Sequence, residues 1–334
     1  MFSKKISWIF SKDQELIIKA EEEDLGFGFY PAERPPELYL KYGVINIDKP
    51  PGPTSHQVTT WVKNMIDVTK AGHGGTLDPM VTGVLPIGLE KATAAMRYVV
   101  GSSKEYVGIL RLHGNVNKEE IYRVFRMFRG RIYQRPPQKS SVKRRLRTRE
   151  IYDLEIIEIE NRDILFRVDC QSGFYVRKLA HDIGLILGVE GHLSELRRIR
   201  AGPFTEENII DLYTLKAAIH IWKENDDFEP LRKIILPVEY IFISYPKIIV
   251  KDTAVASIAY GASLKAPGII GVTNDVKKGE RVAIMSKKGE LIATAISQHD
   301  ANEIIEMDKG NVVVIERVFM ERDLYPPMWK KSPQ

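Results

Sequence analysis

One carboxylate of this sequence lies in a segment whose composition suits a tightly constrained loop, and it is the first candidate for chemistry. Asp78 follows the run GHGGTL at 72–77 and precedes Pro79. The glycines permit backbone angles that other residues avoid and let a ligand come close, while Pro79 restricts the conformation of Asp78. Ordinary turns have the same composition. The octapeptide alone therefore leaves a catalytic acid and a plain turn both open.

Three further segments, 104–106, 172–182 and 196–204, place charged or aromatic residues where a core would exclude them. Arg177 falls in the first turn of a predicted helix, where the helix dipole disfavours a cation. A nearby carboxylate would compensate, and Asp78 is one candidate. Pairing with Asp182 or exposure to water would explain Arg177 equally well, because Asp78 is distant from it in the sequence.

The composition is that of a globular protein able to form two cored domains. The chain has 334 residues, 44% of them hydrophobic, and it lacks an apolar stretch of the roughly 18–20 residues that a membrane span needs. Its one cysteine, Cys170, excludes an intramolecular disulfide and suits a reducing compartment, so we expect a cytoplasmic protein. The seven histidines lack H-x-x-x-H spacing, so we expect no metal.

The charge distribution predicts a nucleic-acid partner. Net charge is only +5, yet residues 121–149 hold eleven Lys or Arg and no Asp or Glu, with aromatic residues between them. Interleaved aromatic residues disfavour a disordered tail, and clustered cations can neutralise phosphates. A solvated basic face is the alternative. The RNA-binding candidates in this block are Lys139, Lys143, Arg144, Arg145, Arg147 and Arg149.

Periodicity and turn signals predict an α+β fold around a central mixed or antiparallel sheet. Strands are expected at 43–47, 106–112, 151–160 and 164–170, and helices at 119–129, 175–187, 212–223 and after a cap at Thr54 or Ser55. Residues 14–20 are expected to form a short strand or helix, and the proline-rich segment 30–36 a linker. Five short strands between 248 and 318 predict a small β-barrel-like domain.

The motifs, in this order, resemble those of TruB-type pseudouridine synthases, most closely the archaeal dyskerin group, whose members are catalytic subunits of box H/ACA ribonucleoprotein particles. The matching segments are 49–56, 72–86, 104–106, 173–184 and 196–204, with a PUA-like segment from about 246. The resemblance covers nearly the whole chain. It implies an N-terminal extension at 1–40 packed on a PUA domain, a catalytic domain at 41–244, the PUA domain at 245–325 and a tail at 326–334.

The resemblance also implies a role for each motif. Asp78 is the catalytic aspartate, Arg177 pairs with it, and Tyr106 stacks on the target base. His73 takes the stacking position left by the extruded nucleotide, and residues 134–149 form a loop that closes over RNA. Tyr175 and Leu196 line the pocket, and Lys49 and Pro50 support the catalytic loop. The PUA contacts to the guide RNA are assigned to Gly261, Ala262, Leu264 and Lys265.

The reaction so implied breaks the N1–C1′ bond of a uridine, turns the base and joins C5 to C1′. Positive charge develops on the sugar, as in glycoside hydrolysis. A carboxylate can attack C1′ or act on the sugar as a base, and the sequence leaves both routes open for Asp78. Neither redox chemistry nor hydrolysis occurs, so no cofactor is expected. Arg177 would keep Asp78 ionised in a dry pocket, since burial disfavours a charged carboxylate.

Three functions compete at this point. The first is a guide-RNA-directed synthase that modifies ribosomal RNA, with a possible guide-independent activity on uridine 55 of transfer RNA. The second is a stand-alone synthase for that transfer-RNA uridine, and the third is an RNA-binding scaffold without catalysis. The partners implied for the first are a box H/ACA guide RNA, RNA substrates, two small proteins that dock on the catalytic domain and a kink-turn-binding protein, with no membrane.

Overall fold

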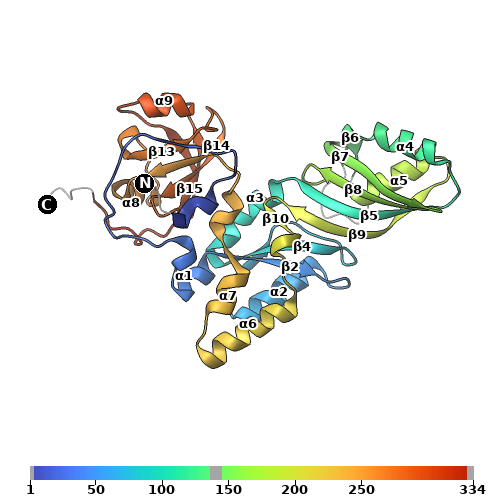
Figure 1. Cartoon of the computed structure of the whole chain (residues 1–334), viewed down its shortest axis with the longest axis horizontal. Helices are drawn as coiled ribbons and strands as arrows, with labels where there is room; N and C mark the ends of the chain where they lie inside the picture. The colour runs from blue at the N-terminus through green and yellow to red at the C-terminus, as the bar shows by residue number, and fades with distance from the viewer. Residues whose placement is uncertain (1–3, 136–144, 329–334) are drawn as a thin grey trace. The chain divides into compact units, whose positions relative to one another are not determined.

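Two compact units make up the part of the chain that the structure describes, residues 4–135 and 145–328 of a computed structural model (Figure 1). The central unit comprises Val44–Leu89 and Ala95–Ile234. The terminal unit joins the described residues up to Gly43 with Glu90–Ala94 and the described residues from Ile235 onward. The family resemblance implied residue 245 for this last boundary.

A mixed sheet organises the central unit. Its strand order is β2-β4-β9-β5-β8-β7-β6, with β3 paired to β4 and β10 to β9. These neighbours are antiparallel except β4 and β9, which run parallel. The predicted α+β fold with a central mixed sheet is confirmed. The strand bounds are β2 (Gly43–Lys49), β3 (Ala71–His73), β4 (Thr82–Leu89), β5 (Lys104–Leu112), β6 (Gly130–Gln134), β7 (Arg147–Glu160), β8 (Asp163–Cys170), β9 (Gly191–Ala201) and β10 (Phe204–Thr205).

Helices α4 (Lys118–Met127) and α5 (Val176–Ile186) pack on the β5–β8–β7 part of this sheet and form a common core with it (Figure 1). Helix α4 buries Ile121, Val124 and Phe125, which share one face because they are three and four residues apart. The ring of Phe125 meets that of Phe166 of β8 edge-on at 6.0 Å. The other helices of this unit are α2 (Ser55–Ile66), α3 (Met96–Gly101), α6 (Leu212–Asn225) and α7 (Glu229–Ile234).

The terminal unit is a barrel-like β-domain with strand order β1-β13-β12-β14-β15-β16. Strand β1 pairs antiparallel with β13. A strand near the beginning of the described chain therefore joins the sheet formed by strands near its end. The strand bounds are β1 (Leu16–Ile18), β12 (Lys247–Val250), β13 (Ile269–Thr273), β14 (Arg281–Ser286), β15 (Leu291–Ser297) and β16 (Val313–Val318), with β11 at Ile235–Pro237. The α-helices are α1 (Pro36–Lys41), α8 (Asp252–Ala259) and α9 (Ala301–Glu306).

Short 3-10 helices connect many of these elements. They are η1 (Lys4–Ile9), η2 (Pro31–Glu33), η3 (Glu90–Ala95), η4 (Glu206–Asn208), η5 (Val238–Phe242) and η6 (Ala266–Gly268). The terminal unit extends back to Ile235 because η5 packs within it. The Phe242 ring meets that of Phe319 at 6.0 Å, and Arg34 pairs with Glu239 at 2.7 Å.

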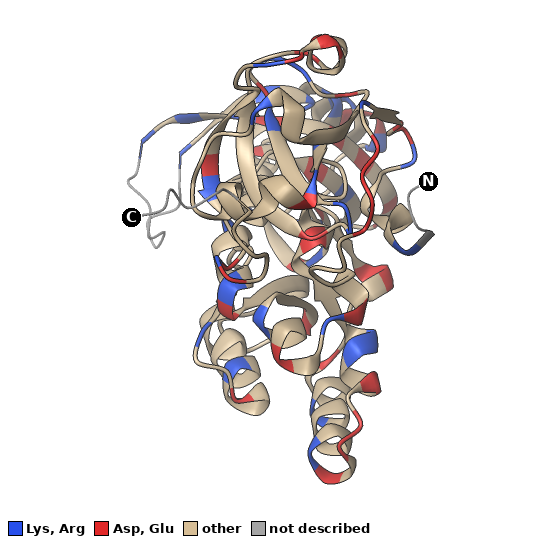
Figure 2. Ribbon diagram, turned by 90° about the vertical axis from the view of Figure 1, so that its left-hand side faces the viewer, with Lys and Arg blue, Asp and Glu red and all other residues tan. Residues whose placement is uncertain are grey.

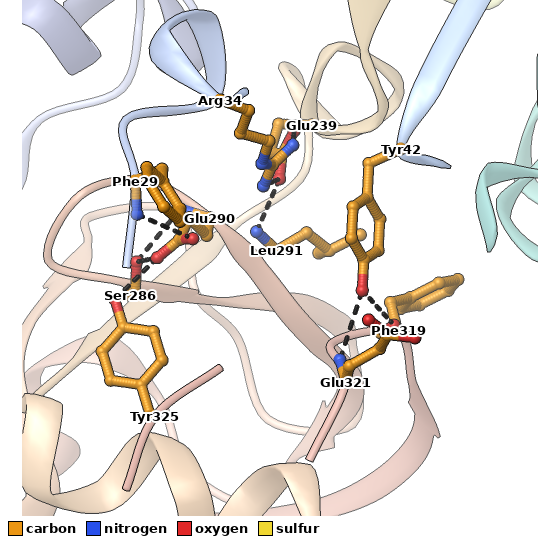
Figure 3. A network of polar contacts seen from close by, with 10 residues as sticks. All are labelled: Phe29, Arg34, Tyr42, Glu239, Ser286, Glu290, Leu291, Phe319, Glu321 and Tyr325. Atoms are coloured by element: carbon orange, nitrogen blue, oxygen red, sulfur yellow. Dashed lines mark hydrogen bonds and ion pairs between the residues drawn. The ribbon is translucent and has the colours of Figure 1, made fainter. Parts of the chain in front are cut away.

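A buried polar network fastens the N-terminal segment within the terminal unit (Figure 3). The Glu290 carboxylate accepts hydrogen bonds from the Phe29 amide at 3.1 Å, the Ser286 hydroxyl at 3.0 Å and the Tyr325 hydroxyl at 2.6 Å. Burial raises the pKa of Glu290, although Arg34 and these donors oppose the effect. Buried polar groups are stable only when they are paired in this way, so the network fixes the path of residues 28–34.

Most expected elements are present, with four differences. The predicted hairpin at 151–170 and the helices at 119–129, 175–187 and 212–223 appear as β7–β8, α4, α5 and α6. Strands β3, β4, β6, β9, β10 and β11 were not expected. Strand β9 contains the basic residues of segment 196–204, and the turn of that segment follows at 202–203. The linker at 30–36 contains η2 and the first residue of α1, and the helices α3, α7, α8 and α9 were not expected.

The fourth difference concerns the loop expected at 134–149. Its ends are paired strand residues, Gln134 of β6 opposite Arg147 of β7, and residues 136–144 lie outside the described part of the chain. No helix in the described chain is long and apolar enough to cross a membrane. Basic and acidic residues are interspersed along both units (Figure 2).

Candidate active site

Asp78 lies in the loop between β3 and β4, and this loop is fixed through its backbone. The Ser55 hydroxyl at the start of α2 donates to the Leu77 carbonyl at 3.0 Å and accepts from the Leu77 amide at 2.8 Å. The Val81 amide closes a turn onto the Asp78 carbonyl at 3.0 Å. The carboxylate is thereby presented by a rigid segment.

Lys49, at the end of β2, is the second anchor of the loop. Its Nζ donates to the carbonyls of Pro50 at 2.8 Å, Pro79 at 2.7 Å and Val81 at 2.9 Å. The side chain is fully buried, and this burial lowers its pKa while the nearby Asp78 charge raises it. Lys49 and the Pro50 carbonyl therefore occupy the supporting place expected for them.

The glycines of the loop allow close packing. A Cβ on Gly74 would lie 2.6 Å from the Val99 side chain, and Gly75 has a φ of +132°. L side chains rarely adopt that angle. The His73 Nδ1 accepts the Gly75 amide at 3.3 Å, and burial, Arg198 and His56 all lower the His73 pKa. His73 therefore contacts the loop backbone rather than lining the pocket described below.

Arg177 in the first turn of α5 forms an ion pair with Asp78, with Nη2 2.7 Å from Oδ2. Asp182 pairs instead with Lys178. The expected dry surroundings are absent: the side chains of Arg177 and Asp78 are 54% and 47% exposed. Pro79 and Met80, which follow Asp78, are exposed as well, so water must be excluded by something that binds there.

A pocket of about 500 Å³ in the central unit opens beside this ion pair. It gathers Asp78, Tyr106, Tyr175, Arg177 and Leu196 from the loop, β5, the start of α5 and β9. These are five of the residues that the sequence motifs single out. The remaining lining residues are Gly75, Thr76, Leu77, Val81, Val100, Lys104, Cys170, Gln171, Gly173, Phe174, Val176 and Arg198.

Two buried cations in this pocket were missed as site residues. Lys104 is 6% exposed, and its Nζ donates to the carbonyls of Val99, Val100 and Ser102 at the end of α3; burial lowers its pKa to about 7. Arg198 is 1% exposed. Strand alternation is the signal that could have found them, since Lys104 shares a face with Tyr106 and Arg198 with Leu196.

The basic candidates before and within β7 are only partly described. Lys139, Lys143 and Arg144 lie outside the described residues. Arg145 is exposed, and Arg147 and Arg149 lie on β7. Arg149 donates from Nε to the carbonyl of Gly173 at 3.2 Å, and Gly173 lines the pocket. This guanidinium therefore lies at the pocket rim.

The four PUA candidates follow α8 and do not share one environment. Gly261, Ala262 and Lys265 are exposed, and Gly261 has a φ of +94°. Leu264 is 1% exposed and belongs to the hydrophobic core of the terminal unit. Its side chain does not reach the surface, so Leu264 is corrected from a candidate RNA contact to a core residue that orients this turn.

Comparison with known families assigns most of this chain. Residues 63–176 match the TruB family pseudouridylate synthase N-terminal domain, and residues 177–243 the tRNA pseudouridylate synthase B C-terminal domain. Residues 246–319 match the PUA domain and residues 3–59 the DKCLD domain. The first two matches include the loop, strands and helix that line the pocket.

Individual relatives match over nearly their full lengths. Proteins named probable tRNA pseudouridine synthase B from Methanopyrus kandleri and Pyrococcus abyssi are each 50% identical, over 96% and 95% of this chain and 95% and 96% of theirs. The structure resembles a chain of a Cbf5-Nop10-Gar1 complex with a TM-score of 0.87 and 48% identity, over 96% of this chain and 99% of that one. A chain of an H/ACA RNP bound to a substrate RNA containing 2′-deoxyuridine gives 0.88 and 46%, over 95% and 98%.

Proposed function

The chain belongs to the TruB family of pseudouridine synthases, and from this premise we propose that it is the catalytic subunit of a guide-RNA-directed H/ACA particle. The observation that carries the proposal is the extent of the structural likeness: 99% of the Cbf5-complex chain is covered, including the N-terminal segment and the PUA domain. A guide-dependent enzyme needs such an RNA-binding domain in addition to its catalytic pocket.

Asp78 is the residue we assign to the sugar. Breaking the N1–C1′ bond builds positive charge at C1′, and among the pocket residues Asp78 is the carboxylate available to meet it. The Arg177 guanidinium, with Nη2 2.7 Å from Oδ2, orients the carboxylate. Attack on C1′ and removal of a sugar proton both satisfy this geometry.

Tyr106, Tyr175 and Leu196 provide the walls that we assign to the detached uracil. The base must remain in place while it turns, so the pocket has to hold it and exclude water. Since Asp78 and Arg177 are about half exposed in the unbound chain, the RNA itself is expected to close the site. Extruding a uridine costs roughly a few kcal/mol, which the basic residues near the rim would offset through phosphate contacts.

A second activity is favoured by the names of the curated relatives, which are called tRNA pseudouridine synthases. We therefore include guide-independent modification of uridine 55 of transfer RNA as a second candidate function. A scaffold without catalysis is disfavoured, because the pocket brings together an intact carboxylate, its arginine partner and an aromatic wall.

The partners we propose follow from the same likeness. The solved relatives are chains of a Nop10-Cbf5 complex, a Cbf5-Nop10-Gar1 complex and an H/ACA RNP bound to substrate RNA. For this chain we propose two small proteins of those kinds, a box H/ACA guide RNA and ribosomal RNA targets, with a kink-turn-binding protein on the guide.

The test compares the full chain, with its two small partners, on two RNA substrates. We expect conversion of a target uridine only when the matching guide is present, and conversion of a transfer-RNA transcript without any guide, both measured by carbodiimide primer extension. Guide-independent modification of transfer RNA alone would overturn the H/ACA assignment. Absence of product on both RNAs, with binding retained, would support the scaffold.

A further inference from the structure

Arg198 is a buried cation that no carboxylate compensates. It is 1% exposed, and among the described residues no Asp or Glu oxygen lies within the 4.0 Å of a salt bridge to it. Burial lowers its pKa. Burying a guanidinium without a counter-ion is costly, so a residue that contributed only to packing would be better served by an apolar side chain. Its contacts indicate what the charge does.

The Arg198 guanidinium contacts three separate elements of the pocket. Nε donates to the Val84 carbonyl of β4 at 2.8 Å, and Nη2 donates to the Gly75 carbonyl of the Asp78 loop at 3.0 Å. Its cross-strand neighbour on β5 is Tyr106, which also lines the pocket and whose hydroxyl interacts electrostatically with the guanidinium. One side chain therefore ties the loop that carries the carboxylate to the aromatic wall.

We propose, on the basis of the function proposed above, that Arg198 is a positioning residue that sets the Tyr106 ring relative to the Asp78 loop. A guanidinium has only donors and a fixed planar fork, so a tilt of the ring or a shift of the loop would disturb one of these contacts. The detached uracil must present C5 to C1′ after it turns, and this step depends on the spacing between Tyr106 and Asp78. Misplacement of about 1 Å can cost on the order of 100-fold in rate.

The first experiment measures single-turnover rates of Arg198→Met and Arg198→Lys on guide-paired target RNA. We expect a fall of about 100-fold for the Met variant and a smaller fall for the Lys variant, which keeps the charge but loses the fork. The dissociation constant for RNA should stay within about three-fold, because Arg198 does not reach the surface. Arg197→Met is the matched control: its guanidinium pairs with Asp48 and Glu206 outside the pocket.

A double-mutant cycle with Tyr106→Phe separates positioning from general destabilisation. Phe keeps the ring and removes only the hydroxyl with which Arg198 interacts. If Arg198 acts through Tyr106, its effect in the Phe background should be at least about five-fold smaller than in the wild type, whereas independent sites multiply. Melting temperatures establish that each variant is folded, and Arg198→Lys with Tyr106→Phe completes the cycle if Arg198→Met does not fold.

Multiplicative effects, or a rate for Tyr106→Phe within two-fold of wild type, would overturn the assignment to Arg198. These outcomes are distinct from failure of the proposed function, because they compare the rates of variants with the rate of a wild-type chain that is active. A wild-type chain that converts no uridine would instead count against the proposed function.

Discussion

Asp78 is constrained through the backbone of its loop, which leaves its carboxylate free for chemistry. Ser55, Lys49 and Arg198 all bond carbonyls or amides of residues near it. Among described side chains, the ion pair with Arg177 is the contact made to the carboxylate itself. Catalysis depends on groups that need no rearrangement during the reaction, and a loop held in this way satisfies that requirement.

Replacement of Asp78 by Asn should abolish product formation while RNA affinity stays within a few-fold. The amide is nearly isosteric but can neither attack C1′ nor accept a proton, and the loop anchors remain in place. Carbodiimide primer extension measures product, and filter binding measures affinity. Residual activity comparable to wild type would remove Asp78 from the chemistry, and a large loss of affinity would indicate that the variant had disturbed the loop.

The candidate site was predictable where a residue type was unusual in its local context. Asp78 beside glycines and Arg177 at a helix N-terminus are anomalies visible in the sequence, and the structure places them 2.7 Å apart. Lys104 and Arg198 were not anomalous in this way: alternation along β5 and β9 places them on the same faces as Tyr106 and Leu196, but their burial depends on β5 and β9 being adjacent strands. That pairing joins residues about ninety positions apart, which no local pattern reports.

At the scale of elements, helices and hairpins were predicted correctly where the sequence has clear capping or turn residues at their ends. Helix α2 begins at a complete capping box, with Thr54 and Gln57 bonding each other's backbone amides. The β7–β8 hairpin turns at Asn161, which has a φ of +54°. Strand β9 was missed because three of its residues are arginines rather than the β-branched and aromatic residues typical of strands. Two of them, Arg197 and Arg200, form ion pairs with carboxylates of other strands.

Gly28→Ala should destabilise the terminal unit much more than Gly26→Ala. Both glycines have positive φ, 67° and 81°, so both variants incur the left-handed penalty of about 1–2 kcal/mol. A Cβ at Gly28 would also lie 2.2 Å from the Tyr325 hydroxyl and 2.3 Å from a Glu290 oxygen, whereas Gly26 faces open space. The clash falls on the buried network of Figure 3.

We therefore expect Gly28→Ala to lower the free energy of unfolding by about 3 kcal/mol or more and Gly26→Ala by no more than about 2 kcal/mol. Denaturant unfolding of the two purified variants gives both values directly. Equal losses would mean that the network yields without cost, and the path of residues 28–34 would then be fixed by other contacts.

At the scale of the whole molecule, the net charge is only +5, yet the basic block at residues 121–149 should dominate RNA binding. The triple variant Arg145→Gln, Arg147→Gln, Arg149→Gln should bind RNA more weakly and with a flatter salt dependence. Removing one arginine that neutralises a phosphate lowers the slope of log affinity against log salt by about 0.7 for single-stranded RNA. Binding isotherms over a series of salt concentrations measure this slope.

The control removes three arginines that already pair with carboxylates. The triple variant Arg111→Gln, Arg232→Gln, Arg281→Gln changes net charge equally, but its guanidiniums pair with Asp163, Glu229 and Glu316. If both triple variants changed the slope alike, the effect would be one of net charge, and the block before and within β7 would have no specific role.

Each unit also contains a buried lysine whose ammonium is held by backbone carbonyls and whose pKa is strongly lowered. Lys247 donates from Nζ to the carbonyls of Ile243 at 2.9 Å and Tyr245 at 2.7 Å, and to the Gln14 side chain at 2.7 Å. Burial lowers the pKa of Lys247 to about 7, and that of Lys104 in the central unit likewise to about 7. Both groups therefore bind fewer protons in the folded chain than in the unfolded chain above neutral pH.

This difference predicts that the free energy of unfolding rises with pH between about 7 and 9. In that window the unfolded lysines, with an ordinary pKa of 10.5, stay protonated while the folded ones lose their protons, so raising the pH favours the folded state. Above pH 9 the buried Cys170 thiol opposes the trend, because burial raises its pKa to about 12.

Lys247→Met should flatten the rise, whereas Lys277→Met, which removes an exposed lysine, controls for the lost charge. Denaturant midpoints at pH 7, 8 and 9 test this, and a slope unchanged by Lys247→Met would mean that Lys247 stays charged in the folded chain.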